Sequence, residues 1–134
     1  MIEKAVQTEE ETRALLAQVR KEDVDGILAP PSLSLNIAGA ILEVSIHRAI
    51  PTMFSAHGTF FVEEGGLASF GADAYAAGRE AARLVDKILK GVAPAEIPVE
   101  ATTQIELAIN LKTAKALELT IPPEVLYWAD RLVR

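Results

Sequence analysis

The feature that most constrains the fold of this chain is an alternation between short apolar runs and longer segments with helical periodicity. The runs are too short for helices, and both of their faces are apolar, which is typical of strands buried in a parallel sheet. The segments between them are long enough to cross from one parallel strand to the next. The sequence therefore predicts an α/β fold built on a three-layer parallel sheet. The predicted strands are residues 27–29, 50–54, 67–70 and 106–109.

The helical segments begin with residues that commonly cap helices. Thr8 precedes the first helix with Glu11 three residues later, Asp73 precedes the clearest helix, and Asn110 precedes a short one. The predicted helices are residues 8–21, 34–48, 73–90, 110–117 and a last one that opens at Pro122 and Pro123 and runs through Leu132. The helix at 73–90 carries an apolar stripe of Tyr75, Ala82, Val85 and Leu89.

Length, charge and composition limit the classes of protein to which this chain can belong. The 134 residues carry a net charge of −6 and no cysteine. This length fits a single domain, residues 1–134, and the acidic balance argues against a nucleic-acid partner. A disulfide scaffold and a thiolate metal site are excluded. No apolar run approaches the 18 or so residues of a membrane span, and the start has no signal-peptide pattern. We therefore expect a soluble chain that carries no targeting signal.

The ends of the predicted strands give the candidate binding residues. Ligands of open α/β sheets bind outside the carboxyl ends of the strands, which selects the loops after the first three strands. Their hydroxyls, imidazole, carboxylate and helix amides suit a small polar ligand. Each also has a structural interpretation: the serines and the aspartate can cap helices, and the tyrosine can pack. The candidate ligand-binding residues are Pro31, Ser32, Ser34, Ser55, His57, Gly71, Asp73 and Tyr75.

Catalytic motifs are absent from the sequence. There is no nucleophile elbow and no phosphate-binding lysine loop. Ser55 and His57 lie two residues apart, but nothing marks an acid that would orient the imidazole. Two scattered histidines match no metal-ligand spacing. We therefore expect no catalytic residue, no metal and no cofactor, and we do not expect an enzyme.

Three stretches together resemble a known family. They are residues 24–31 (VDGILAPP), residues 65–75 (GGLASFGADAY), and a tail that includes residues 106–117 (ELAINLKTAKAL) and 119–123 (LTIPP). They resemble the carboxyl-terminal half of the substrate-binding proteins of ABC-type uptake systems, in the group with tryptophan- and tyrosine-type binders. The resemblance implies half of a type I periplasmic-binding-protein fold, a flavodoxin-like lobe. It also implies a non-catalytic protein that binds a small solute, possibly an amino acid, in an interlobe cleft and delivers it to a membrane permease. Such proteins are periplasmic or are lipoproteins of the cell surface.

The resemblance also implies how the residues of this chain are divided between the two lobes of the fold. Residues 1–65 and 104–134 would belong to the second lobe, and the strand and helix in residues 67–98 would belong to the first. The family often carries an acid–amide pair after the double proline, where this chain has Ser32 and Leu33.

A strand–helix unit without its own sheet favours exchange between two copies, so we expect a homodimer. The alternative is a standalone flavodoxin-like or receiver-like regulatory or interaction module.

Overall fold

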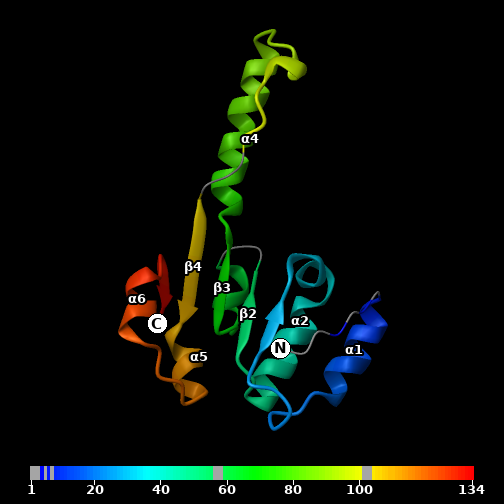
Figure 1. Ribbon diagram of the computed structural model, residues 1–134, viewed down its shortest axis with the longest axis vertical. Helices are drawn as coiled ribbons and strands as arrows, with labels where there is room; N and C mark the ends of the chain where they lie inside the picture. The colour runs from blue at the N-terminus through cyan, green and yellow to red at the C-terminus, as the bar shows by residue number, and fades with distance from the viewer. Residues whose placement is uncertain (1–3, 5, 7, 56–58, 101–103) are drawn as a thin grey trace.

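The computed structural model describes residues 4, 6, 8–55, 59–100 and 104–134, with residues 31–37 described by their backbone alone. Its elements lie along the chain in an alternating order (Figure 1). They are α1 (Glu9–Gln18), β1 (Ile27–Ala29), α2 (Pro31–Arg48), β2 (Thr52–Phe54), α3 (Phe60–Glu63), β3 (Ala68–Ala72), α4 (Ala74–Leu89), the 3-10 turn η1 (Pro94–Glu96), β4 (Ile105–Asn110), α5 (Leu111–Ala116), α6 (Pro123–Trp128) and β5 (Arg131–Val133). The α/β class and the three capping residues are confirmed, because Thr8, Asp73 and Asn110 each accept a backbone hydrogen bond from the first turn that follows.

The five strands form one mostly parallel sheet in the order β1-β2-β3-β4-β5. Three neighbouring pairs are parallel, but β3 and β4 are antiparallel. The expectation that every strand pair is parallel is therefore wrong at this one position. The reason is that α4 does not cross back over the sheet as a connecting helix. The chain runs outward along α4, returns beside it, and re-enters the sheet in the opposite direction.

Strand β3 lies inside the sheet. Ala68–Ala72 pairs with β2 on one side and with β4 on the other, from Ala68 beside Ile109 to Ala72 beside Ile105. We expected the strand at 67–71 to leave the lobe together with the helix that follows it, and this is wrong for the strand. Pairing on both sides satisfies the strand's backbone donors and acceptors. They would have no partners if the strand left the sheet together with α4.

Helices α2 and α3 cover one face of the sheet. Ala29 and Phe54 are buried on that face, and the Phe54 ring stacks on Phe61 of α3 with 4.7 Å between ring centroids. Helix α1 packs outside α2 and contributes Leu16 to the same core. Gly66 has no space for a side chain, because a Cβ there would lie 2.8 Å from the Phe54 ring. This tight packing fixes the connection between α3 and β3.

The opposite face of the sheet is exposed over β1, β2, β3 and the start of β4. Leu28 pairs with Met53, and Met53 pairs with Ala68, so these side chains lie on one face. Phe70 and Ile105 continue the same face by strand alternation. We call Leu28, Met53, Phe70 and Ile105 the open face, because all four are exposed large hydrophobic residues.

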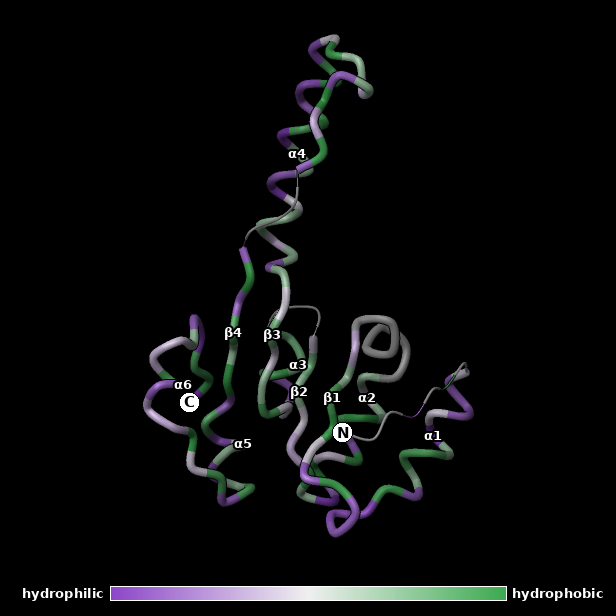
Figure 2. Tube along the Cα trace, viewed as in Figure 1, coloured by the Kyte–Doolittle hydropathy of each residue, from purple (hydrophilic) through white to green (hydrophobic). Residues whose placement is uncertain are grey.

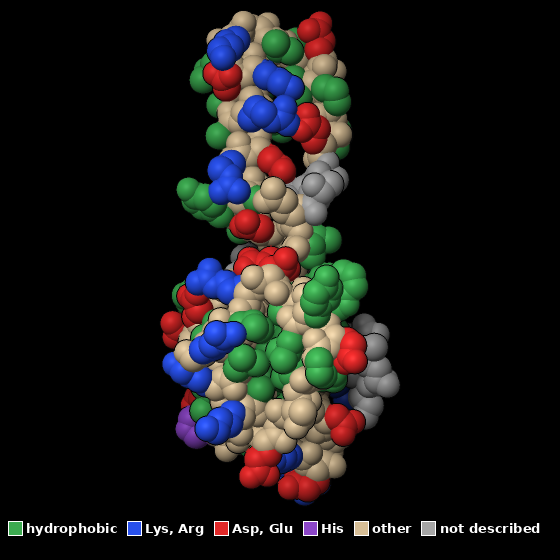
Figure 3. Space-filling model, turned by 90° about the vertical axis from the view of Figure 1, so that its left-hand side faces the viewer, with side chains coloured by type: hydrophobic (Ala, Val, Ile, Leu, Met, Phe, Trp, Pro, Cys, Tyr) green, Lys and Arg blue, Asp and Glu red, His purple; other side chains and the backbone are tan. Residues whose placement is uncertain are grey.

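Helix α4 and the segment that returns beside it, residues 74–100, form an arm that projects from the lobe (Figure 1). Arg83 of the helix forms an ion pair with Glu100 of the returning segment. A narrow waist joins the arm to the lobe, and hydrophobic side chains lie on both parts (Figure 3). Hydrophobic residues recur along the whole arm in the hydropathy view (Figure 2). Tyr75, Val85 and Leu89 of the predicted apolar stripe are exposed.

The carboxyl terminus differs from the sequence expectation. The last helix was expected to run through Leu132, but α6 ends at Trp128 and residues 131–133 form β5. Asp130 breaks the helix, because its backbone N–H donates to the Leu107 carbonyl and its carboxylate accepts from the Leu107 N–H. These two bonds align the next residues with β4.

Candidate functional site

The carboxyl ends of β1, β2 and β3 meet at one edge of the sheet, because these three strands are parallel. We call this the carboxyl edge. The arm leaves the lobe from the same edge, since α4 directly follows β3 (Figure 1). Because β4 is antiparallel to β3, its first residue, Ile105, also lies there beside Ala72.

The structure brings four of the candidate residues to the carboxyl edge. Ser55 follows β2, Gly71 lies within β3, and Asp73 and Tyr75 lie at the start of α4. Pro31, Ser32 and Ser34 open α2 directly after β1, but their side chains lie outside the described residues. His57 also lies outside them.

Ser55 connects the ends of two strands. Its hydroxyl donates to the Ala29 carbonyl at 3.1 Å, and its backbone N–H donates to the same oxygen at 3.0 Å. The hydroxyl is half-buried and retains lone pairs that can accept a further hydrogen bond. Ser55 therefore has a structural role at this edge and the capacity to contact a ligand.

Asp73 caps α4. Its carboxylate accepts from the Tyr75 N–H at 2.8 Å and from the Ala76 N–H at 3.1 Å. The Tyr75 ring, in contrast, is 75% exposed, and the Arg79 guanidinium lies over it at 4.6 Å from the ring centroid. Tyr75 thus offers an aromatic surface with an adjacent cation at the base of the arm.

A hollow at the carboxyl edge contains residues that sequence reasoning missed. It has a volume of about 320 Å³ and is lined by Asp73, Gln104, Ile105, Glu106 and Asp130. Sequence reasoning placed the start of the 106–109 strand at the far edge, because it assumed that the strand was parallel. The three carboxylates in the hollow favour a cationic group, such as a protonated amine.

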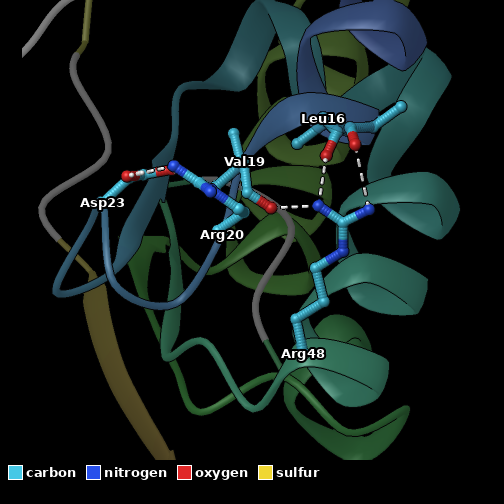
Figure 4. Close-up of polar contacts among 6 residues, drawn as sticks. Leu16, Val19, Arg20, Asp23 and Arg48 are labelled. Atoms are coloured by element: carbon cyan, nitrogen blue, oxygen red, sulfur yellow. Dashed lines mark hydrogen bonds and ion pairs between the residues drawn. The ribbon is translucent and has the colours of Figure 1, made fainter.

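A second hollow, of about 330 Å³, lies between α1 and α2. His47, in the last turn of α2, lines it and contacts the Glu43 carbonyl through Nδ1 at 2.8 Å. Arg48 also lines it and donates to the carbonyls of Leu16, Ala17 and Val19 at the end of α1 (Figure 4). No residue of the carboxyl edge lines this hollow. The hydrogen bonds from Arg48 hold α1 against α2 beside it.

The turn before β1 holds an exposed ion pair. The Arg20 guanidinium donates to the Asp23 carboxylate at 2.9 Å and holds the pKa of that carboxyl below its ordinary value (Figure 4). This pair lies at the opposite edge of the sheet from the candidate site, because it precedes β1.

Among the residues that the structure describes, no group of three or more His, Asp or Glu side chains is placed to hold a metal ion. Within the same described part, no helix is long and apolar enough to cross a membrane.

Comparison with known proteins identifies the family. The model of the ABC transporter substrate-binding protein family matches residues 1–133. The chain belongs to this family. A relative, the tyrosine-binding protein of Clostridioides difficile (strain R20291), is 31% identical over 122 residues, which are 89% of this chain and 34% of that protein.

Two solved structures have the same fold as this member of the substrate-binding protein family. A conserved domain protein from Vibrio cholerae O1 biovar eltor has a TM-score of 0.75 and 29% identity, over 92% of this chain and 40% of that chain. An ABC domain in complex with L-Trp from Streptococcus pneumonia has a TM-score of 0.75 and 28% identity, over 92% of this chain and 41% of that chain. The chain therefore spans about a third to two fifths of the length of these relatives, which is consistent with half of a type I periplasmic-binding-protein fold.

Proposed function

We propose that this chain is the substrate-binding component, or a part of it, of an ABC-type uptake system. Its carboxyl edge forms one wall of an interlobe cleft that binds a small solute, and the protein is not an enzyme. The observation that carries this proposal is the family match over residues 1–133, together with the meeting of three strand ends and the arm at one edge.

The ligand that fits best is an aromatic amino acid. The names of two relatives, a tyrosine-binding protein and a domain in complex with L-Trp, support this class. The carboxylates of Asp73, Glu106 and Asp130 suit the ammonium group of an amino acid. Helix α2 begins at the same edge, and the N-terminus of a helix suits a carboxylate. The exposed Tyr75 ring suits an aromatic side chain.

The partners follow from the same family. The solute is passed to a membrane permease, so the protein acts outside the cytoplasm, in the periplasm or as a lipoprotein of the cell surface. A homodimer of this chain is a further partner in this proposal, because the apolar stripe of α4 is exposed.

A panel of amino acids in a thermal unfolding experiment tests the proposed function. A ligand at ten times its dissociation constant stabilises the folded state by about 1.4 kcal/mol, which raises the Tm by roughly 4 °C for a domain of this size. L-tyrosine or L-tryptophan is expected to give such a rise at millimolar concentration. A panel in which no amino acid raises the Tm contradicts the proposal.

Two exposed tyrosines provide a matched pair of variants. Tyr75 is 75% exposed at the carboxyl edge, and Tyr127 is 85% exposed on α6. Tyr75→Ala is expected to remove at least half of the ligand-induced rise, whereas Tyr127→Ala leaves it unchanged. Equal losses in the two variants would contradict a site at the carboxyl edge.

A further inference from the structure

We propose that Arg79 positions the ring of Tyr75 and thereby gives the candidate site its preference for a solute with an aromatic side chain. Both residues lie at the base of the arm, where α4 leaves the carboxyl edge (Figure 1). This inference rests on the proposed function, because it names a positioning residue for that same site.

The first turn of α4 is fixed to the lobe, which determines where the Tyr75 side chain begins. The Asp73 carboxylate accepts from the backbone N–H groups of Tyr75 at 2.8 Å and of Ala76 at 3.1 Å. The Asp73 N–H donates to the Gln104 carbonyl, in the segment that leads into β4, at 2.9 Å. Ala76 is 2% exposed. The backbone of Tyr75 is therefore held at the carboxyl edge, and its remaining freedom is the rotation of its side chain.

Arg79 restricts this rotation. It follows Tyr75 by four residues, so the two side chains are neighbours on one face of α4. The guanidinium carbon lies 4.6 Å from the centroid of the Tyr75 ring, which is the geometry of a cation–π contact. Within the part of the chain that the structure describes, Arg79 forms no ion pair, whereas Arg83, one turn further along, pairs with Glu100. No described carboxylate therefore competes with the ring for the Arg79 guanidinium.

Gly78 leaves space beside the Tyr75 ring. It follows Tyr75 by three residues and lies on the same face of α4 as Arg79. A Cβ atom placed on Gly78 has no atom of the described residues within 4 Å. Glycine destabilises the interior of a helix relative to alanine, because its backbone has more freedom to lose on folding. At this position the missing side chain leaves room for a planar group next to the ring.

These contacts favour a flat aromatic side chain over a flexible aliphatic one. An aromatic amino acid carries its ammonium group and its ring on adjacent carbon atoms, so the two groups need neighbouring parts of the site. Asp73 lines the hollow proposed for the ammonium group, and Tyr75 follows two residues later on α4. A ring that is already held in one orientation loses less conformational entropy when a solute packs against it. Two aromatic rings also gain free energy from their relative geometry beyond the area that they bury, which an aliphatic side chain does not.

An NMR titration of the isotopically labelled chain with L-tryptophan and with L-leucine tests this selectivity. Arg79→Gln removes the cation and is expected to weaken L-tryptophan binding by about two- to five-fold, the strength of an exposed cation–π contact. The dissociation constant of L-leucine, the weaker ligand, is expected to stay the same, so the ratio of the two constants falls by that factor. Arg83→Gln removes a cation one turn further along the same helix and is expected to leave the ratio unchanged.

Gly78→Leu separates ligand binding from folding. The leucine side chain fills the space beside the Tyr75 ring and is expected to weaken L-tryptophan binding more than Arg79→Gln does. Leucine has a higher helix propensity than glycine, so the midpoint of thermal unfolding is expected to rise in the same variant. Damage to the fold would lower both quantities. L-tryptophan binding that is unchanged in Gly78→Leu would contradict a ring subsite at this position.

The contact between Arg79 and Tyr75 is also measurable without a solute. The ring current of Tyr75 is expected to move the Arg79 side-chain proton signals upfield, and Tyr75→Ala is expected to abolish this displacement. Its absence from the unmodified chain would overturn the inference. An unchanged ratio of dissociation constants in Arg79→Gln would overturn the inference but leave the proposed function standing. A chain in which no amino acid moves any signal would overturn the proposed function, and the inference with it.

Discussion

Asn110 illustrates how one side chain can hold several elements together. Its amide nitrogen donates to the Val62 carbonyl of α3 at 2.7 Å, and its amide oxygen accepts from the Thr113 N–H of α5 at 3.0 Å. Its backbone N–H donates to the Leu67 carbonyl at 2.9 Å. The residue is 4% exposed, so water cannot replace these partners. Asn110 therefore fixes the end of β4 against the segment that leads into β3.

Replacement of Asn110 is expected to destabilise the protein markedly. Asn110→Ala leaves the Val62 carbonyl and the Thr113 N–H without their side-chain partner, at a cost of about 2–3 kcal/mol in the free energy of unfolding. Asn110→Ser keeps an oxygen that can cap α5 and is expected to lose about half as much. Urea denaturation followed by circular dichroism measures both. An alanine variant as stable as the unmodified protein would contradict this role.

At the scale of elements, α1 depends on a residue 30 or so positions away in sequence. Its last turn contains no basic residue to balance the carbonyl groups at its end. Arg48, the last residue of α2, supplies that charge by donating to Leu16 at 3.2 Å, to Ala17 at 3.0 Å and to Val19 (Figure 4). The end of α1 is therefore completed by tertiary structure.

Arg48→Met is expected to loosen α1 selectively. The variant keeps most of the aliphatic stem but removes the guanidinium donor from the carbonyls at the end of α1, which costs about 1–2 kcal/mol. Amide hydrogen exchange is expected to speed up in α1 and to change little in β4. Arg20→Met serves as the control, because Arg20 pairs with Asp23 in solvent and its loss is expected to leave α1 unchanged. Equal exchange in α1 for both variants would refute the role of Arg48.

The elements also mark the limits of prediction from sequence. The caps at Thr8, Asp73 and Asn110 depend on residues within a few positions, so sequence alone predicts them. The direction of β4 and the existence of β5 depend on the route of the chain through space, and a short apolar run has the same pattern in either direction. Because the direction of β4 was wrong, the sequence did not predict that Glu106 and Asp130 line a hollow at the carboxyl edge. The strand-end rule correctly places Ser55, Gly71, Asp73 and Tyr75 at the carboxyl edge, but it does not predict that the Ser55 hydroxyl bonds to Ala29.

The whole molecule consists of a lobe with a covered face and an open face, and an arm that leaves from the carboxyl edge (Figures 1 and 3). A solute bound to a single edge keeps much of its surface in water, whereas real pockets bury about 70–90% of a small ligand. This geometry explains why a second wall matters to the proposed function. It also predicts that a chain held in the monomeric state binds amino acids only weakly.

The central claim is that the carboxyl edge is the solute site, and an NMR titration of the isotopically labelled chain tests it most directly. L-tyrosine or L-tryptophan added to millimolar concentration is predicted to shift the backbone amide signals of Ser55, Gly71, Asp73 and Tyr75. The backbone amide signals of residues that line the hollow between α1 and α2, such as Arg13 and His47, are predicted not to shift. Shifts confined to that hollow, or no shifts at all, would contradict the account.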